Sequence, residues 1–145
     1  MDIKNTLSNF QLENSRLIHF DIDNDFSELP ANGTENSLSI GNPFHRVFKK
    51  DGVLFALLQL QINHTIEETK TERKLSMTLV IEGLFSFSGG TEEQFRQMLV
   101  LNGNSALYSI ARAHILSITS MALISGRVVL PMINFLKVAE KLEKQ

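Results

Sequence analysis

The sequence contains no cysteine and no tryptophan, and its 145 residues include one tyrosine and three prolines. Without thiols the chain has no disulfide framework, thiolate nucleophile or thiolate metal site, and nothing in its cysteine usage points to an oxidising compartment. An excess of one charge is also missing, since 14 Lys and Arg face 16 Asp and Glu and leave a formal net charge of −2. So balanced a chain has no field that attracts phosphate backbones, and we expect no nucleic-acid partner.

Long apolar runs are absent as well. No stretch reaches 18 uninterrupted apolar residues, and the first six residues lack the apolar core of a signal peptide. We therefore expect a cytoplasmic protein without membrane insertion. Hydrophobic residues make up 43% and charged residues 21%, both near globular averages, and the length is that of one domain. This composition predicts a single folded domain over residues 1–145.

Motifs for catalysis and cofactor binding are also missing. None of the eight glycines falls in a phosphate-binding loop, and residues 103–107 lack the second glycine of a nucleophile elbow. The four histidines are scattered singly, without the spacing that places two imidazoles on one metal. We expect no cofactor, no metal and no enzymatic activity. A site assembled across an oligomer interface would escape motif inspection, so that alternative stays open.

Alternating apolar and polar residues predict an antiparallel sheet in the first half of the chain. The polar stretch 67–72 forms a hairpin between the two longest strands, and residues 23–43 carry only scattered apolar side chains, which predicts a long connection. Strands are expected at residues 16–22, 44–49, 53–66 and 74–87. The fold class is therefore α+β: a four-stranded antiparallel meander with a long crossover loop, and two main helices packed on it.

Helices are expected in the second half. Thr91 and Gln94 form a capping box, so a short helix begins at Glu92. A longer helix runs from about residue 104 to 125 and stops at Gly126. A last helix, with an apolar stripe, is expected from residue 135 to 144.

The helix at 104–125 is apolar over most of its circumference, and Arg112 is its only strong charge. A single sheet covers one side of a helix, so we expect a second copy of the chain to cover the rest. A monomer wrapped by the long connection and the last helix remains the alternative. His114 is expected to be a hydrogen-bonded core histidine. The residues expected in the oligomer interface are Leu107, Ile110, Ala111, His114, Ile118 and Met121.

Phenylalanine occurs ten times, and three of these residues, Phe26, Phe44 and Phe48, fall in or beside the long connection. Large apolar residues beside such a segment suit a groove for other apolar chains, and Met77 and Met132 add adaptability. The same residues would equally serve to close the core over the sheet. Composition leaves the two interpretations open.

Four segments of the second half resemble the SecB family of protein-export chaperones: residues 83–89, 104–112, 118–121 and 130–135. The resemblance implies a four-stranded sheet with two main helices, assembled as a dimer of dimers with the long helices between the sheets. It also implies ATP-independent holding of unfolded polypeptides in apolar grooves, with transfer to SecA in export. By position, it assigns peptide binding to Phe26, Leu29, Phe44, Val47, Phe48, Leu75, Met77, Leu79, Ile81, Met132, Phe135 and Leu136.

Two departures from the export members bear on the partner. Ser76 and Thr78 stand where those members carry carboxylates, with only Glu82 remaining, and their acidic C-terminal tail has no counterpart here. Other members of the family serve antitoxins, a role that needs the groove but not SecA. The sequence thus predicts a holdase for unfolded or pre-secretory polypeptides, with a dedicated antitoxin chaperone as the alternative. A purely structural oligomer that binds one folded ligand is also left open.

Overall fold

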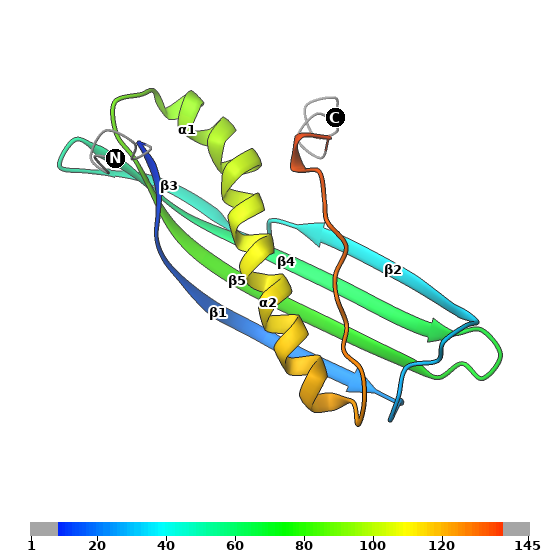
Figure 1. Ribbon diagram of the computed structural model, residues 1–145. Coiled ribbons are helices and arrows are strands. Elements are labelled where there is room, and N and C mark those ends of the chain that lie inside the picture. The colour runs from blue at the N-terminus through cyan, green and yellow to red at the C-terminus, as the bar shows by residue number, and fades with distance from the viewer. Residues whose placement is uncertain (1–8, 138–145) are drawn as a thin grey trace, which may run out of the picture.

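The computed structural model describes residues 9–137 as one sheet crossed by one long helical run (Figure 1). Five strands come first in the chain, and the helical segments follow. The strands are β1 (Phe10–Asn24), β2 (Thr34–Gly41), β3 (His45–Lys50), β4 (Val53–Glu68) and β5 (Lys74–Phe87). The helical segments are α1 (Glu92–Met98), the π-helical η2 (Leu99–Gly103) and α2 (Asn104–Ala122).

The strands form one antiparallel sheet in the order β1-β5-β4-β2, and β3 also pairs with β4. β2 pairs with residues 61–68 of β4 and β3 with residues 53–58, so the two lie end to end along one edge. Residues 25–33 form the crossover that carries the chain from β1 at one edge to β2 at the other (Figure 1). The expected α+β class, with an antiparallel sheet, a crossover and a long helix, is confirmed.

One strand lies where the sequence predicts a loop. Residues 34–41 form β2, so the long connection is shorter than expected and the sheet has five strands instead of four. Leu38 and Ile40 are the only two large apolar residues of this strand. An edge strand has one face on the core and one edge in solvent, so two alternating apolar positions are enough to hold it.

The helix-facing side of the sheet holds most of the core. Residues of β4 and of β5 up to Leu79 alternate in burial, as a strand covered on one face requires, and residues 79–83 of β5 are buried on both faces. Seven side chains of this face are almost fully buried: Ala56, Leu60, Ile62, Leu75, Leu79, Ile81 and Phe85. The helical run crosses this face diagonally (Figure 1).

The helical run is continuous, whereas the sequence predicts two separate helices. It begins at the expected capping box, where the Thr91 hydroxyl accepts from the backbone N–H of Gln94. The five residues of η2 then join α1 to α2 without a break. Such π-helical turns insert an extra residue and re-aim the side chains around them, and they are frequent at functional sites.

A segment we call the strap, residues 123–134, follows α2 without regular helix or strand structure. It runs beside α2 and over the sheet (Figure 1). The buried Val128 donates its N–H to the hydroxyl of Thr119 at 2.8 Å, and Arg112 Nε donates to the carbonyl of Leu130 at 3.0 Å. A helix starts at Phe135, as expected, but most of the predicted range 135–144 lies outside the described residues.

The helical run packs closely on Gly83 of β5, and this gives a first prediction. A Cβ at Gly83 would lie 2.7 Å from Phe85 Cε2 and 2.8 Å from Leu107 Cδ2. We expect Gly83→Ala to lower the free energy of unfolding by about 1–3 kcal/mol, the usual range for overpacking a core. Urea denaturation checks this. Gly41→Ala is the matched control because nothing lies within 4 Å of a Cβ there, and an equal loss in both variants would contradict the steric account.

Candidate functional site

An apolar hollow of about 510 Å³ lies between the interrupted edge of the sheet and the helical run. We call it the middle hollow. Its floor comes from β4, one wall from the end of β2 and the start of β3, and the opposite wall from α1, η2 and the start of α2. Its lining is mostly apolar and includes Ile40, Leu58, Leu60, Leu99, Val100 and Phe135.

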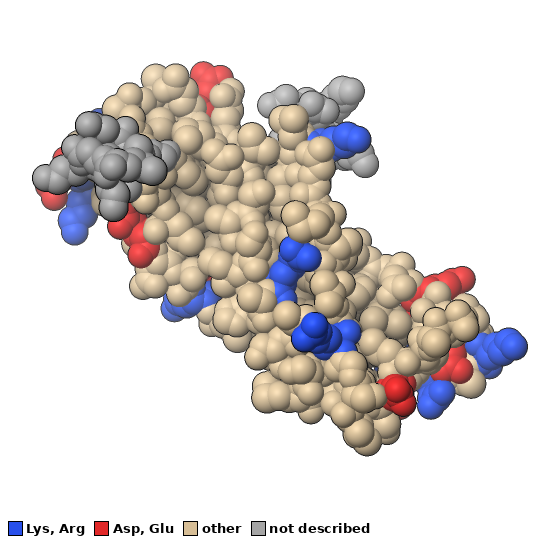
Figure 2. Space-filling view, in the orientation of Figure 1, with Lys and Arg blue, Asp and Glu red and all other residues tan. Residues whose placement is uncertain are grey.

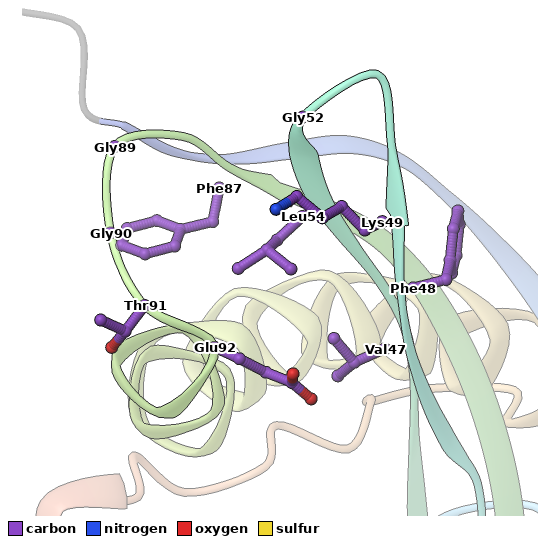
Figure 3. A pocket seen from close by; sticks show the side chains of 10 residues that line it. All are labelled: Val47, Phe48, Lys49, Gly52, Leu54, Phe87, Gly89, Gly90, Thr91 and Glu92. Atoms are coloured by element: carbon purple, nitrogen blue, oxygen red, sulfur yellow. The ribbon is translucent and has the colours of Figure 1, made fainter.

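Two further hollows flank the middle one. The strap hollow, of about 520 Å³, is bounded by the crossover, β2, β4 and the strap, with Leu29, Leu38, His64, Ile66 and Val128 among its lining residues. The hairpin hollow, of about 420 Å³, lies between the β3–β4 hairpin and the turn before α1. In Figure 3 the side chains of Val47, Leu54 and Phe87 project toward this hollow, whereas the Phe48 side chain points away.

The three hollows follow one another along the same edge. On the helix-facing side, Leu38 of β2 borders the strap hollow, Ile40 and His45 border the middle hollow, and Val47 of β3 borders the hairpin hollow. This order results from the alternation of side chains along β2 and β3. We call the row of three hollows the edge groove. Figure 2 shows the face that carries the helical run as mostly uncharged, with the acidic groups near its two ends.

A pair of asparagines fixes the wall of the middle hollow at the break between β2 and β3. Asn42 Nδ2 donates to Asn104 Oδ1 at 2.7 Å and to the carbonyl of Gln59 at 2.7 Å. Asn104 is buried, and its Nδ2 donates to the carbonyl of Val100 at 2.9 Å. The pair therefore connects the β2–β3 link, on one side of the hollow, to the helical run, on the other side.

The peptide-binding residues expected from the sequence are divided by the structure. Leu29, Val47 and Phe135 line the edge groove, whereas Phe44, Met132 and Leu136 are exposed and line none of its three hollows. Phe48 contributes to the hairpin hollow, but its ring stacks on Phe55 with centroids 5.6 Å apart, on the side of the sheet away from the helix.

Five of the expected peptide-binding residues belong to the core instead. Leu75, Met77, Leu79 and Ile81 are buried beneath the helical run, so they form no open surface in this chain. Their alternation reports the core face of β5, which a sequence cannot distinguish from a groove face. Phe26 is likewise buried, with the Arg73 guanidinium 5.3 Å from its ring centroid.

The expected interface residues of α2 are divided too. Leu107 and Ala111 are fully buried against this chain's own sheet, so their assignment to a subunit interface is wrong. Ile110 and Ile118 are half-buried at the flanks of the helix, and Met121 is 76% exposed. His114 is exposed, which corrects the expected core histidine.

Sequence reasoning missed the residues that make up most of the middle hollow. Ile40, Leu58, Leu99 and Val100 come from three different elements, β2, β4 and η2, that meet only in the fold. The apolar pair at 38 and 40 within a polar stretch was the one local signal. The π-helical turn η2, which supplies Leu99 and Val100 to this hollow, carries no recognisable sequence signal.

His64 is the one buried histidine among the described residues, and it gives a prediction on pH. Burial lowers the pKa of its imidazole from the usual 6.5. As pH falls, His64 therefore takes up a proton in the unfolded chain before it does so in the folded chain. This difference lowers the free energy of unfolding as pH falls from about 6.5 to the pKa of His64 in the folded chain. Between about pH 7 and pH 5, we expect the melting temperature of His64→Leu to fall less than that of the natural chain. The exposed His114→Leu is the control, and equal pH profiles for all three would contradict the assignment.

Residues 9–137 contain no cluster of three or more His, Asp and Glu side chains arranged to hold a metal ion. No helix in the described part of the chain is long and apolar enough to cross a membrane.

Comparison with known proteins gives the fold but no sequence family. No family model and no curated protein matches the sequence. Among solved structures, the chain is similar to the SecB-like chaperone Rv1957 of Mycobacterium tuberculosis, determined with a ChAD peptide from the antitoxin HigA1. The TM-score is 0.65 and the identity 17%, over 86% of this chain and 90% of that one. A Streptococcus agalactiae protein of unknown function matches with a TM-score of 0.57 and 17% identity, over 85% and 97% of the two chains. The fold is thus SecB-like.

Proposed function

We propose that this protein is a SecB-like chaperone that holds an extended, apolar segment of another polypeptide in the edge groove without ATP. The observation that carries the proposal is the row of three hollows along one sheet edge on a SecB-like fold. An extended chain directs successive side chains to opposite sides, so alternate apolar residues can enter a row of hollows. Several weakly held side chains on one client give tight overall binding.

The client that we propose is the antitoxin of a toxin–antitoxin system. The similar mycobacterial chaperone was solved with an antitoxin peptide, which supports this class of client. β5 also offers little to SecA on its outer face, because its one carboxylate, Glu82, is buried. The two oxygens of Glu82 accept from Arg16 Nε and Gln59 Nε2, each at 2.9 Å. The cytoplasm is the compartment that this role requires.

A general holdase for unfolded or pre-secretory polypeptides is the second candidate, since the same groove would serve it. An array of overlapping peptides from the antitoxins and preproteins of the host separates the two. A dedicated chaperone binds segments of one antitoxin and does not prevent aggregation of a urea-unfolded protein. A general holdase binds many segments and prevents that aggregation without ATP. Failure to bind any peptide on the array would contradict the chaperone proposal itself.

We also propose that the outer face of α2 packs against a second copy, in a dimer of dimers. Met121, in the last turn of α2, is 76% exposed, and Ile124, just after the helix, is 87% exposed. The remainder of this face is formed largely by serine and alanine. Small side chains allow two helices to approach closely, and exposed large apolar ones favour burial. Light scattering tests this: we expect four times the chain mass for the natural protein and a smaller particle for Met121→Asp. A monomeric natural protein would refute it.

A further inference from the structure

The strap hollow contains a buried polar atom that nothing in the described structure satisfies. His64 projects from β4 into this hollow and is 6% exposed. Its Nδ1 is buried and has no hydrogen-bond partner, and it is the only such side-chain atom in the described part of the chain. The rest of the lining is largely apolar, with Leu38 on the strand opposite and Val128 from the strap, and it also includes Asn36 and Arg127.

An orphaned buried nitrogen costs free energy in the empty state, and folded proteins pair nearly all such atoms. Burial also favours the neutral imidazole, as the lowered pKa of His64 indicates. A neutral imidazole presents one N–H donor and one acceptor nitrogen. A ligand atom that forms a hydrogen bond with Nδ1 would therefore remove a destabilising feature of the empty protein and gain binding free energy.

We propose that the strap hollow is a subsite for a tyrosine side chain of the bound polypeptide, with the tyrosine hydroxyl hydrogen-bonded to Nδ1 of His64. This inference rests on the proposed function, because it names which client side chain one hollow of the edge groove takes. Nδ1 is covered in the empty hollow. The imidazole therefore turns about its Cβ–Cγ bond, a soft torsion, or the strap shifts, as the client side chain enters.

Tyrosine fits this hollow by both of its parts. Its ring is apolar and rigid, and the walls offered by Leu29, Ile66 and Pro131 suit such a surface. Its hydroxyl both donates and accepts, so it pairs with Nδ1 in either imidazole tautomer. Phenylalanine would fill the same space and leave Nδ1 unsatisfied, and an ammonium group would be desolvated in a hollow whose one charged lining residue is the like-charged Arg127.

The first test needs no variant of the protein. The probe is a short peptide of alternating serine and valine with a lysine at each end and one central guest residue, either tyrosine, phenylalanine or glutamate. Fluorescence anisotropy gives its affinity for the intact protein. We expect the tyrosine peptide to bind about 2- to 10-fold more tightly than the phenylalanine peptide, the range for one net hydrogen bond. A glutamate peptide that binds most tightly of the three would overturn the tyrosine subsite, because Arg127 of the lining would then select the ligand.

The second test locates the contact. In His64→Leu the preference for tyrosine over phenylalanine should vanish, whereas it should persist in the control His45→Leu, which alters the middle hollow. Should His64→Leu fail to fold, ¹⁵N spectra of the natural protein still report on the four histidine rings. We expect the chemical shift of His64 Nδ1 to change when the tyrosine peptide is added and to remain unchanged when the phenylalanine peptide is added.

The outcomes separate this inference from the proposed function. Equal affinity for the tyrosine and phenylalanine peptides overturns the tyrosine subsite and leaves the chaperone proposal standing. A tyrosine preference that survives in a folded His64→Leu, or leaves the His64 signal unmoved, also overturns it. No binding of any of the three peptides, together with no binding on the antitoxin array, overturns both.

Discussion

Val100→Asp is expected to weaken binding of an apolar client peptide by about 30-fold or more, equivalent to about 2 kcal/mol, without unfolding the protein. Val100 belongs to η2 and is half-buried in the wall of the middle hollow. A carboxylate at this position keeps contact with water while the hollow is empty. A bound client side chain would remove that water. The lining is mostly apolar, and its one Arg or Lys, Arg96, is already paired with Glu92, so the new charge finds little replacement.

The matched control for this variant is Gln97→Asp. Gln97 is exposed on α1, one turn earlier in the same helical run, so the new charge and the helical context are the same but the hollow is untouched. Anisotropy with the client peptide measures both affinities, and circular dichroism shows that both variants are folded. A similar loss in the two variants would mean that long-range charge, and not the middle hollow, governs binding.

Phe95→Ala is expected to cause the largest loss of stability, about 3–5 kcal/mol in the free energy of unfolding. Phe95 is fully buried and is the only buried residue of α1. Its ring stacks on Phe87 of β5 at a centroid distance of 5.5 Å and meets Phe10 of β1 edge-on at 6.0 Å. Removing the ring leaves a cavity where the start of the helical run is attached to two strands.

Phe44→Ala is the control, because it deletes the same ring from a half-exposed position on the β2–β3 link. We expect it to cost less than about 1 kcal/mol, as is usual for exposed positions. Chemical denaturation monitored by circular dichroism measures both variants. Comparable losses would show that the aromatic cluster of Phe10, Phe87 and Phe95 does not hold the helical run to the sheet.

The sequence was sufficient to predict elements whose signals are local. The strands β4 and β5 alternate over many residues, and the capping box at Thr91 specifies the start of α1 by itself. β1 was located only in part, because register shifts near Leu12 and Leu17 interrupt its alternation. As a result Ile18, which strict alternation would place on the same side as Phe20 and Ile22, is 40% exposed.

The candidate site was harder to predict because it depends on which faces meet. The apolar stripe of β5 and the apolar residues of the edge groove have the same period, and only the position of the helical run decides that Leu79 is core and Val47 is groove. For the same reason, the apolar residues around α2 suggested more exposed apolar surface than this helix has. The sheet buries Leu107 and Ala111, and the strap contacts a further side of the helix through Thr119 and Arg112.

If clients bind in the edge groove as proposed, the break between β2 and β3 sets the spacing between neighbouring client side chains. The last residue of β2, Gly41, pairs with Gln61 of β4, and the first residue of β3, His45, pairs with Leu58. The edge chain therefore takes four residue steps where β4 takes three, which leaves one extra residue on the edge. Lengthening or shortening the link of residues 42–44 would therefore move β3, and the hollow beside it, relative to β2 while the core of β4 and β5 stays in place. Related chains could in this way acquire clients with differently spaced anchor residues through loop length alone.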